Sequence, residues 1–318
     1  MPEVSARTAR KRALAARWLR GRGIEIGALH NPLPVPPAAS VTYVDRLSVE
    51  ALRQQYPTLA HEAFMPVDVI GDAQDLSAFG TCSLDFVIAN HLVEHLEDPI
   101  RGLGEMLRVL MPGGVLYLAV PDPRNTFDRN RPLTTMHHVI ADYRNGTEAS
   151  RQEHFREWVD TVEVLEQPQS WSETDRANRA KQLDGMDYSI HFHVWRPDTF
   201  IELLIAARQE LGLQFELAEA LTCEREDDNE FIFVLLKEVG ASPPLVPTGS
   251  DAAEVGRLRE TLQRATHDRE EAAERAGVAE ERLTASRAQL EALYLTRSWR
   301  VTKPLRWIGR QVRRGAQR

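Results

Sequence analysis

A lone glycine and an aspartate eighteen residues later have types and spacing that could bind a ligand. Gly27 follows a short apolar run at residues 24–26, and Asp45 follows a second apolar run at residues 41–44. If these runs are neighbouring parallel strands, the glycine lets the backbone approach a ligand at their carboxyl ends. The aspartate can accept hydrogen bonds from ribose hydroxyls there. We therefore predict a nucleotide-type site between the two strand ends, although residues 28–32 lack the further glycines of a dinucleotide fingerprint.

A second group of reactive side chains lies between residues 121 and 195, a stretch rich in histidine and charged residues. Its candidate acids, bases and ligands are His137, His138, Asp142, His154, His191 and His193. Imidazole titrates near neutral pH, so any of these histidines could act as a general base or line a polar pocket. We select His191, His193 and His138 as candidate catalytic residues, and we assign His95, which follows the apolar run 84–89, a structural role.

The spacing of two of these histidines also admits a metal site. His191 and His193 are two residues apart, so in a strand they would face one side together, with Glu153 or His154 as a further ligand. This mixed, cysteine-poor set does not match a recognised ligand spacing. Our prediction is that the protein binds no metal.

The elements that must position these residues alternate between buried strands and helices. Five near-continuous apolar runs are separated by helical patterns, which is typical of a parallel sheet covered on both faces. The runs are residues 24–26, 41–44, 64–70, 84–89 and 115–120. We place helices after Ser48, from about Pro99 to the break at residues 112–114, and over 197–211. Two last strands, 215–221 and 231–236, form an antiparallel hairpin, and residues 121–195, with a helical stretch at 149–165, form an insertion over the carboxyl edge of the sheet.

The composition bounds the class of protein. The chain has 318 residues, 42% of them hydrophobic, which is enough for one large α/β domain plus an appendage. Two cysteines, Cys82 and Cys223, cannot form a disulfide framework, so a reducing, cytoplasmic setting is expected. We find no apolar run long enough to span a membrane and no signal peptide at the N-terminus.

The charge is distributed unevenly, and the chain ends differ from its middle. The net charge is −8, yet residues 1–23 hold seven basic groups against one acid, and residues 294–318 hold eight basic groups and no acid. An acidic body between two basic ends argues against a general nucleic-acid binder. We predict that residues 1–22 form a basic helix on the sheet edge. After the α/β domain, we predict a linker at residues 239–250 and a coiled coil with few apolar contact positions at residues 251–295. The last residues, 296–318, are predicted to form a basic tail that contains Trp299 and Trp307.

Five parallel strands, a glycine turn after the first, an acid at the end of the second and a final antiparallel hairpin follow one another along the chain. With these elements in this order, residues 20–238 resemble the class I S-adenosylmethionine-dependent methyltransferases. The resemblance is to the type 11-like group, with G-D-A-x-x-L at residues 71–76 and E-H-L at 94–96. It implies a Rossmann-like α/β domain at residues 23–238 with a seven-stranded sheet, parallel except for the last antiparallel hairpin, and S-adenosyl-L-methionine as cofactor. The cofactor-binding residues that it implies are Glu25, Gly27 and Ala28 in the first motif, Asp45 at the ribose, Asp72 and Ala73 at the adenine, and Asn90 and His91 near the methionine half.

Each implied acid also has a simpler explanation. Asp72 and Asp75 could be turn residues, and Asp45 could cap the helix that follows it. For the reaction, the sulfonium is already a strong electrophile, so holding the acceptor in line at about 3 Å does most of the work. A hydroxyl acceptor would profit from a general base.

The end of the chain suggests a substrate class. The segment YLTRSWRVTKPLR at residues 294–306 resembles the ending that follows coiled coils in bacterial glycosyltransferases and related enzymes of surface-polysaccharide assembly. We therefore expect a cytoplasmic methyltransferase (EC 2.1.1.-) acting on a sugar or glycan intermediate of cell-surface polysaccharide synthesis. The alternatives are methylation of a small lipid-soluble metabolite and a catalytically silent scaffold that recruits glycosyltransferases. Tryptophans among arginines suit a peripheral contact at the inner membrane face, whereas docking of the tail on the acidic body is the simpler reading.

Overall fold

The computed structural model describes residues 6–166, 171–223 and 228–238. By internal contacts the chain forms two units, Met1–Ala265 and Thr266–Arg318, and the described residues all belong to the first. The predicted linker, coiled coil and tail at residues 239–318 lie outside the described residues.

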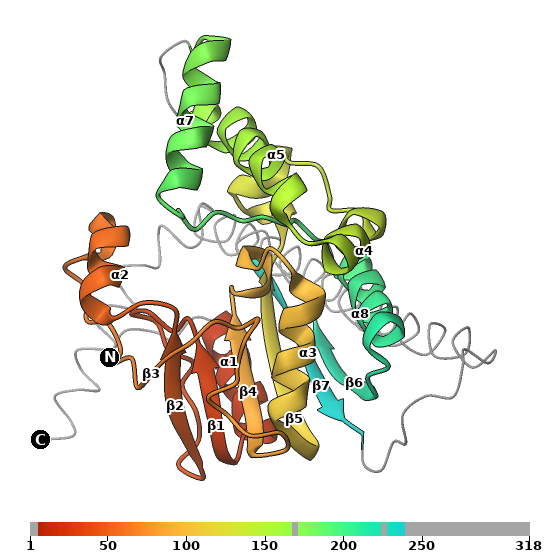
Figure 1. Ribbon diagram of the computed structural model, residues 1–318. Helices are drawn as coiled ribbons and strands as arrows, with labels where there is room; N and C mark the ends of the chain where they lie inside the picture. Colours follow the sequence, from red (N-terminus) through yellow and green to blue (C-terminus); the bar gives the residue numbers. More distant parts are fainter. Residues whose placement is uncertain (1–5, 167–170, 224–227, 239–318) are drawn as a thin grey trace, which may run out of the picture. The chain divides into compact units, whose positions relative to one another are not determined.

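One seven-stranded sheet organises the described part of the chain (Figure 1). Its strands are β1 (Gly21–Ile26), β2 (Ala39–Asp45), β3 (Val69–Ile70), β4 (Leu84–Asn90), β5 (Leu110–Pro121), β6 (Phe215–Leu221) and β7 (Glu230–Lys237). They lie in the order β3-β2-β1-β4-β5-β7-β6, and β7 runs antiparallel to both of its neighbours. The predicted Rossmann-like methyltransferase sheet, with its antiparallel last hairpin, is confirmed.

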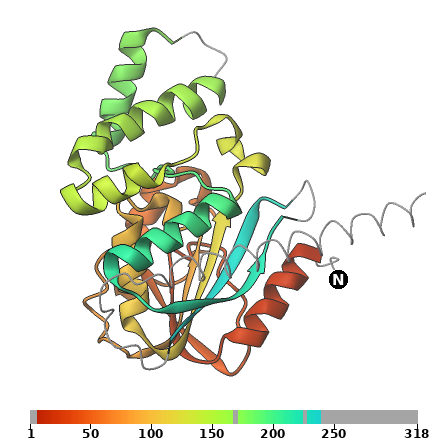
Figure 2. The same ribbon diagram turned by 90° about the vertical axis from the view of Figure 1, so that its right-hand side faces the viewer.

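Helices cover both faces of this sheet, and each face has its own apolar core (Figure 2). On one face, α3 (Pro99–Val109) and α8 (Pro197–Leu211) bury side chains such as Leu103 and Phe200. On the other face, α1 (Ala6–Trp18) packs through Leu14 and Ala15. Helix α1 covers residues 6–18 of the basic helix predicted over 1–22, and it lies on a face of the sheet rather than at its edge. None of the helices among the described residues is long and apolar enough to cross a membrane.

Local sequence chemistry explains where the elements near the site begin and end. Ser48 caps α2 (Val49–Gln55) by accepting a hydrogen bond from the Ala51 amide, as predicted. At Gly23 an added Cβ would lie 2.3 Å from the Phe86 ring, so only glycine allows β1 and β4 to lie this close.

Two predicted boundaries were wrong. The third strand is only Val69–Ile70 instead of 64–70, because Pro66 interrupts the ladder and the Met65 amide donates instead to the Leu29 carbonyl. β5 begins at Leu110 rather than at 115, because Leu110 already pairs with Leu84.

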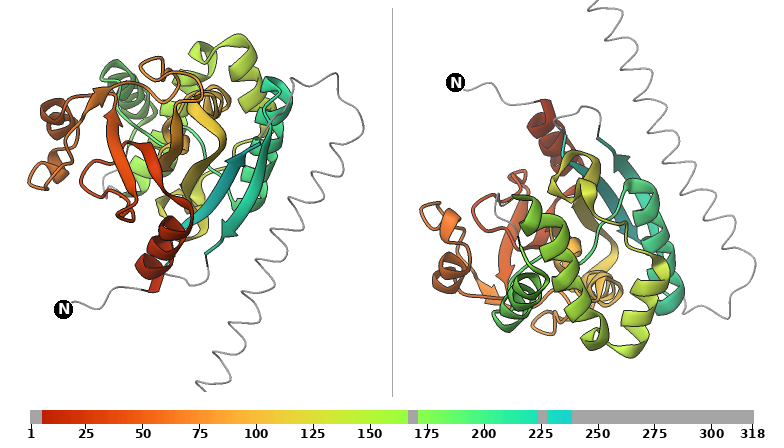
Figure 3. Two further views of the ribbon diagram at one scale, coloured as in Figure 1. Left: turned by 90° about the horizontal axis from the view of Figure 1, so that it is seen from below. Right: turned by 90° about the horizontal axis from the view of Figure 1, so that it is seen from above.

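The insertion forms a helical cap beyond the sheet edge where β1, β4 and β5 end (Figures 1 and 3). Its elements are two 3-10 turns (Pro123–Asn125 and Phe127–Asn130), α4 (Met136–Asn145), α5 (Glu148–Trp158), a π-helical turn (Val159–Glu163), α6 (Val164–Glu166) and α7 (Glu173–Gly185). A separate apolar cluster around Phe155 and Leu183 holds α5 against α7. The single helix predicted over 149–165 is therefore interrupted by a π-helical turn, and α7 was not predicted.

Candidate active site

A cleft opens at the carboxyl ends of β1, β2 and β4, beneath the insertion. Its walls include five of the predicted cofactor residues, which are Gly27, Asp45, Asp72, Ala73 and His91. Other lining residues come from the strand exits and from the segment after α7, and they include Leu29, Arg46, Gln74, His95, Asp187 and Ser189. The remaining predicted cofactor residues, Glu25, Ala28 and Asn90, are not among the residues that line it.

Gly27 and Asp45 are neighbours across two adjacent strands, as the sequence predicts. Ile26 pairs with Val44, and the Gly27 amide donates to the Val44 carbonyl at 2.9 Å. Gly27 has a φ of 73°, a left-handed conformation that glycine adopts without strain, and it starts the turn that leaves β1. This turn removes the chain from the strand end and leaves space beside Asp45 for a ligand.

The Asp45 side chain is available to a ligand because it does not cap the next helix. Ser48 performs that function, and the Asp45 carboxylate accepts a long 3.4 Å hydrogen bond from the Leu47 amide. Burial raises the pKa of Asp45 above its ordinary value, against the backbone amides and the charge of Arg46, which lower it. A pair of ribose hydroxyls would supply the hydrogen bonds that this half-satisfied carboxylate can still accept.

Glu25 does not line the cleft, but its side chain holds the loop that follows Gly27. Its carboxylate accepts the Leu33 amide at 2.9 and 3.1 Å and the Asn90 side-chain amide at 3.4 Å, so it fixes the path of the loop that follows Gly27. The side chain is 1% exposed, and burial raises its pKa to about 7. The structure thus places Glu25 as a support for the loop, which residues 28–32 need because they lack further glycines.

We expect Glu25→Gln to flatten part of the pH dependence of stability. Because the native state binds this proton more tightly than the unfolded chain, Glu25 favours folding fully below pH 4.5, and this contribution is lost as the pH rises through about 7. Between pH about 4 and about 8, the free energy of unfolding of the wild type should fall by roughly 3 kcal/mol relative to that of Glu25→Gln. Urea titrations of both proteins at each pH measure this difference, and parallel curves would contradict it.

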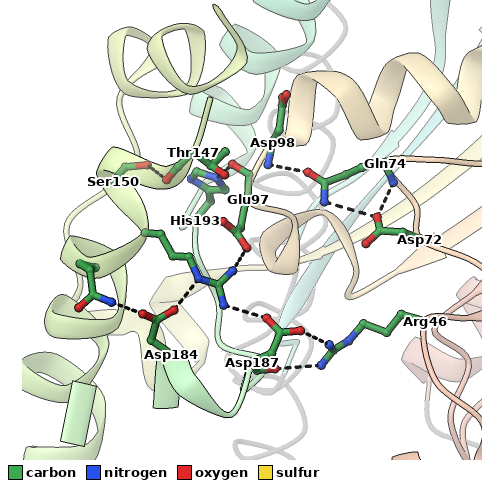
Figure 4. A network of polar contacts seen from close by, with 12 residues as sticks. Arg46, Asp72, Gln74, Glu97, Asp98, Thr147, Ser150, Asp184, Asp187 and His193 are labelled. Atoms are coloured by element: carbon green, nitrogen blue, oxygen red, sulfur yellow. Dashed lines mark hydrogen bonds and ion pairs between the residues drawn. The ribbon is translucent and has the colours of Figure 1, made fainter. Parts of the chain in front are cut away.

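Asp72 and Ala73 lie in a turn that borders the cleft, and Figure 4 shows the hydrogen bonds of Asp72 and Gln74 in this turn. Asp72 Oδ1 accepts the Gln74 amide at 2.7 Å, and Gln74 Oε1 accepts the Asp98 amide at 2.9 Å. The simpler reading of Asp72 as a turn residue is therefore correct. It does not conflict with a ligand role, because Asp72 and Ala73 both line the cleft.

Ion pairs cross from the sheet to the insertion at the mouth of the cleft (Figure 4). Arg46, after β2, lies 2.8 Å from Asp187, which follows α7. Arg151 on α5 contacts the same Asp187 at 2.8 Å, Asp184 at 2.6 Å and also Glu97. The partners are up to 141 residues apart in the sequence, so no local pattern predicts this network.

His91 lines the cleft, and its surroundings favour the protonated form of its imidazole. Its φ is 47°, and its Nε2 lies 2.6 Å from Glu230 Oε2. Burial acts to lower the pKa of His91, but the hydrogen bond and charge of Glu230 and the charge of Glu94 outweigh it and raise the pKa above its ordinary value. A protonated imidazole at this wall would attract an anionic group of a ligand.

His191 sits directly behind the cleft in a group of titratable side chains. Its Nδ1 lies 2.7 Å from Asp128 Oδ2, and its ring packs edge-on against His95, which lines the cleft, with centroids 4.6 Å apart. Burial acts to raise the pKa of Asp128, but the hydrogen bond and charge of His191 and the charge of Arg131 hold it below its ordinary value. Asp128 is therefore a carboxylate that holds the Nδ1 proton of His191 and leaves Nε2 to accept another.

Glu94 and His95 complete this group. His95 Nδ1 donates to the Ile190 carbonyl at 2.8 Å, so the structural role predicted for it is present, and its ring also forms part of the cleft wall. Burial lowers the pKa of His95 well below its ordinary value. Glu94 is 1% exposed, neither of its carboxylate oxygens has a hydrogen-bond partner among the described residues, and burial raises its pKa. This burial was not predicted, because Glu94 lies within a short motif without apolar periodicity.

His138 and His193, the other two candidate catalytic residues, do not line the cleft. The prediction that His191 and His193 face one side together was wrong, because the amides of Phe192 and His193 both donate to the Glu94 carbonyl and the backbone does not alternate as in a strand. His193 meets His138 and His154, and these three are absent from the described lining of the cleft. Of the three candidate catalytic histidines, only His191 contacts the cleft wall through His95.

Residues 21–118 match the family model of a methyltransferase domain. No curated protein matches the sequence. Among solved structures, the chain is similar to the CurJ carbon methyltransferase, with 14% identity, a TM-score of 0.36, and coverage of 70% of this chain and 50% of that one. It is also similar to a possible histamine N-methyltransferase from Thermotoga maritima, with 17% identity, a TM-score of 0.36, and coverage of 73% and 92%. A third similar structure is a putative Zn-dependent alcohol dehydrogenase from Rhodobacter sphaeroides, with 15% identity, a TM-score of 0.44, and coverage of 74% and 92%.

The family-model match and the structural similarities do not support the same conclusions. The chain spans half the length of the CurJ methyltransferase, and structural similarities at these identities and TM-scores carry no argument about activity. The family-model match covers the strands and turns that build the cleft. It shows that residues 21–118 are similar to a methyltransferase domain.

Proposed function

We propose that the cleft binds S-adenosyl-L-methionine and that the protein transfers its methyl group to a hydroxyl of a sugar or glycan intermediate. The observation that carries the proposal is the adjacency of Gly27 and the half-satisfied carboxylate of Asp45 at the sheet edge, opposite the His95 wall. Asp45 would hold the ribose, the turn of Asp72 and Ala73 would meet the adenine, and a protonated His91 would attract the carboxylate of the methionine half.

The bound cofactor supplies an electrophilic methyl group, and the chain must position and deprotonate the acceptor. We assign proton uptake to His191 Nε2, because Asp128 holds the opposite ring nitrogen at 2.7 Å. The proton of the acceptor hydroxyl would reach this nitrogen through one bridging water, because His191 lies behind the His95 wall. The acceptor oxygen would take the methyl group, with the neutral thioether of the cofactor as the leaving group. Asp128 and the nearby Glu94 would stabilise the resulting imidazolium.

Isothermal titration calorimetry of the full-length protein with S-adenosyl-L-methionine tests the cofactor assignment. We expect stoichiometric binding. Transfer of a radiolabelled methyl group to a panel of nucleotide sugars, lipid-linked sugars and small lipid-soluble metabolites then separates the two acceptor classes. Binding without transfer to any acceptor would favour a silent scaffold that recruits glycosyltransferases, and absence of binding would overturn the proposal.

The polysaccharide context rests on the chain end, where residues 294–306 resemble a segment of surface-polysaccharide enzymes. We propose that the basic tail 296–318 holds the enzyme to anionic membrane or to partner enzymes, and that residues 251–295 self-associate as a coiled coil between the linker at 239–250 and the tail. Each basic residue near an anionic lipid surface could contribute about 1 kcal/mol. We keep 23–238 as the proposed limits of the catalytic domain.

Flotation with anionic liposomes tests the membrane role of the tail. We expect the full-length protein to float with the vesicles and a version that ends at Val246 to remain at the bottom. The same pair in neutral liposomes is the control, since an electrostatic contact requires anionic lipid. Equal partitioning of both proteins with anionic vesicles would remove the membrane proposal and leave protein docking.

A further inference from the structure

Three histidines from separate segments meet inside the insertion, away from the cleft. His138 lies on α4, His154 on α5, and His193 on the segment that follows α7. One ring nitrogen of each lies within 4.8 Å of the others, and the Nε2 atoms of His138 and His154 are 2.9 Å apart. This convergence draws on residues up to 55 positions apart, which explains why no recognised ligand spacing appears in the sequence.

Two buried polar atoms at this cluster have no hydrogen-bond partner within the described part of the chain. They are Nδ1 of His193, whose side chain is 1% exposed, and Oδ2 of Asp142, whose side chain is 6% exposed. Asp142 Oδ2 lies 3.3 Å from His138 Nε2, one helical turn away on α4. Hydrogen bonding between His138 and His154 alone leaves both atoms unsatisfied, and such atoms are costly in a protein interior.

The outer hydrogen bonds of His193 and Asp142 leave one acceptor atom of each side chain available to a ligand. His193 Nε2 lies 3.3 Å from the Glu97 carbonyl, so Nε2 carries the proton and the lone pair is on Nδ1. Asp142 Oδ1 accepts the Ser150 hydroxyl at 2.9 Å, which leaves Oδ2 directed elsewhere. Bonds of this kind, from the far side of each ligand to backbone or side chain, are typical of protein metal sites.

We propose that His138, His154 and His193 bind a divalent transition metal, with Asp142 completing the site. Three imidazoles and one carboxylate suit zinc, whereas magnesium and calcium prefer oxygen ligands. The nearby Arg131 carries a positive charge, which its ion pairs with Asp128 at 2.9 Å and with Glu157 at 2.6 Å partly offset. The metal would tie α4 and α5 to the segment that carries His191 and would stabilise the wall behind the cleft.

Metal content of the full-length protein tests the proposal, independently of cofactor binding or methyl transfer. After purification and dialysis, we expect about one equivalent of zinc per chain by mass spectrometry, or about one equivalent of Co²⁺ bound on titration of the chelator-treated protein. Chelator treatment should lower the melting temperature, and Zn²⁺ but not Mg²⁺ should restore it. A protein that takes up neither zinc nor cobalt, with a melting temperature unaffected by chelator, would overturn the site.

Variants then separate ligation from folding. His138→Ala, at a partly exposed position, should weaken Co²⁺ binding by more than about 100-fold. His137→Ala, at the exposed neighbouring position, should leave binding unchanged. His154→Cys should retain Co²⁺ and add a sulfur-to-cobalt charge-transfer band in the near-ultraviolet, a signature that a structural histidine would not give. Metal retained in full by His138→Ala, or absence of this band in metal-loaded His154→Cys, would contradict the assignment.

Discussion

Asp45→Asn is expected to weaken binding of S-adenosyl-L-methionine by about 10- to 100-fold, the loss typical of hydrogen bonds to a charged group. Asparagine keeps the size of the side chain and one acceptor oxygen, but it cannot accept from two ribose hydroxyls with both terminal atoms. The existing contact of the carboxylate is a 3.4 Å hydrogen bond from Leu47, so the native fold should lose little. Calorimetry measures the affinity, and thermal unfolding without cofactor measures the stability.

A matched substitution on the adjoining loop controls for the loss of charge. Asp68 is exposed, lies outside the cleft lining, and accepts the Tyr43 amide at 2.8 Å, a bond that asparagine can preserve. Asp68→Asn should therefore bind the cofactor as the wild type does. Equal affinities for Asp45→Asn and the wild type would show that Asp45 does not contact the ribose.

His191→Ala is expected to lower the rate of methyl transfer by about 10²- to 10⁴-fold, the contribution of a positioned general base. Cofactor affinity should change little, because His191 lies behind His95 and not on the cleft wall. Single-turnover transfer of radiolabel to the acceptor identified in the panel measures the rate, and calorimetry measures the affinity. An unchanged rate would remove His191 from the mechanism.

Asp128→Asn tests whether Asp128 orients the His191 ring for catalysis or only stabilises the fold. The amide cannot hold the Nδ1 proton of His191 as the carboxylate does, so the proton can move to Nε2 and transfer should be slow at neutral pH. The rate should recover partly at high pH, where hydroxide can take the acceptor proton in place of His191. A merely structural role for Asp128 would lower the rate equally at every pH. The exposed His137 supplies the matched histidine control, since His137→Ala should keep the full rate.

Asp45 and His95, which His191 contacts from behind, line the same cleft, and the insertion is joined to the sheet at this cleft by ion pairs. Asp187 connects them, because it pairs with Arg46 after β2 and with Arg151 on α5. Such partly exposed ion pairs contribute little to stability individually.

The sequence by itself determined the sheet and the adjacency of Gly27 and Asp45. Apolar runs of strand length, each followed by a turn residue, specify a buried parallel sheet, and parallel strands bring their carboxyl ends to one edge. Helix α8 and strand β6 were predicted with their observed bounds, because a proline begins the helix and Gly212, with a φ of 64°, ends it. These signals are local, so no tertiary contact was needed to interpret them.

Only the tertiary structure decided how the histidines are distributed. His191 joins Asp128 and His95, whereas His193 joins His138 and His154, because one carbonyl, that of Glu94, accepts two successive amides and turns the backbone between them. Their partners come from 39 to 96 residues away, and side-chain convergence over such distances leaves no periodic trace in the sequence. Packing of the insertion on the sheet therefore determines which histidines can serve the cleft and which form the separate cluster.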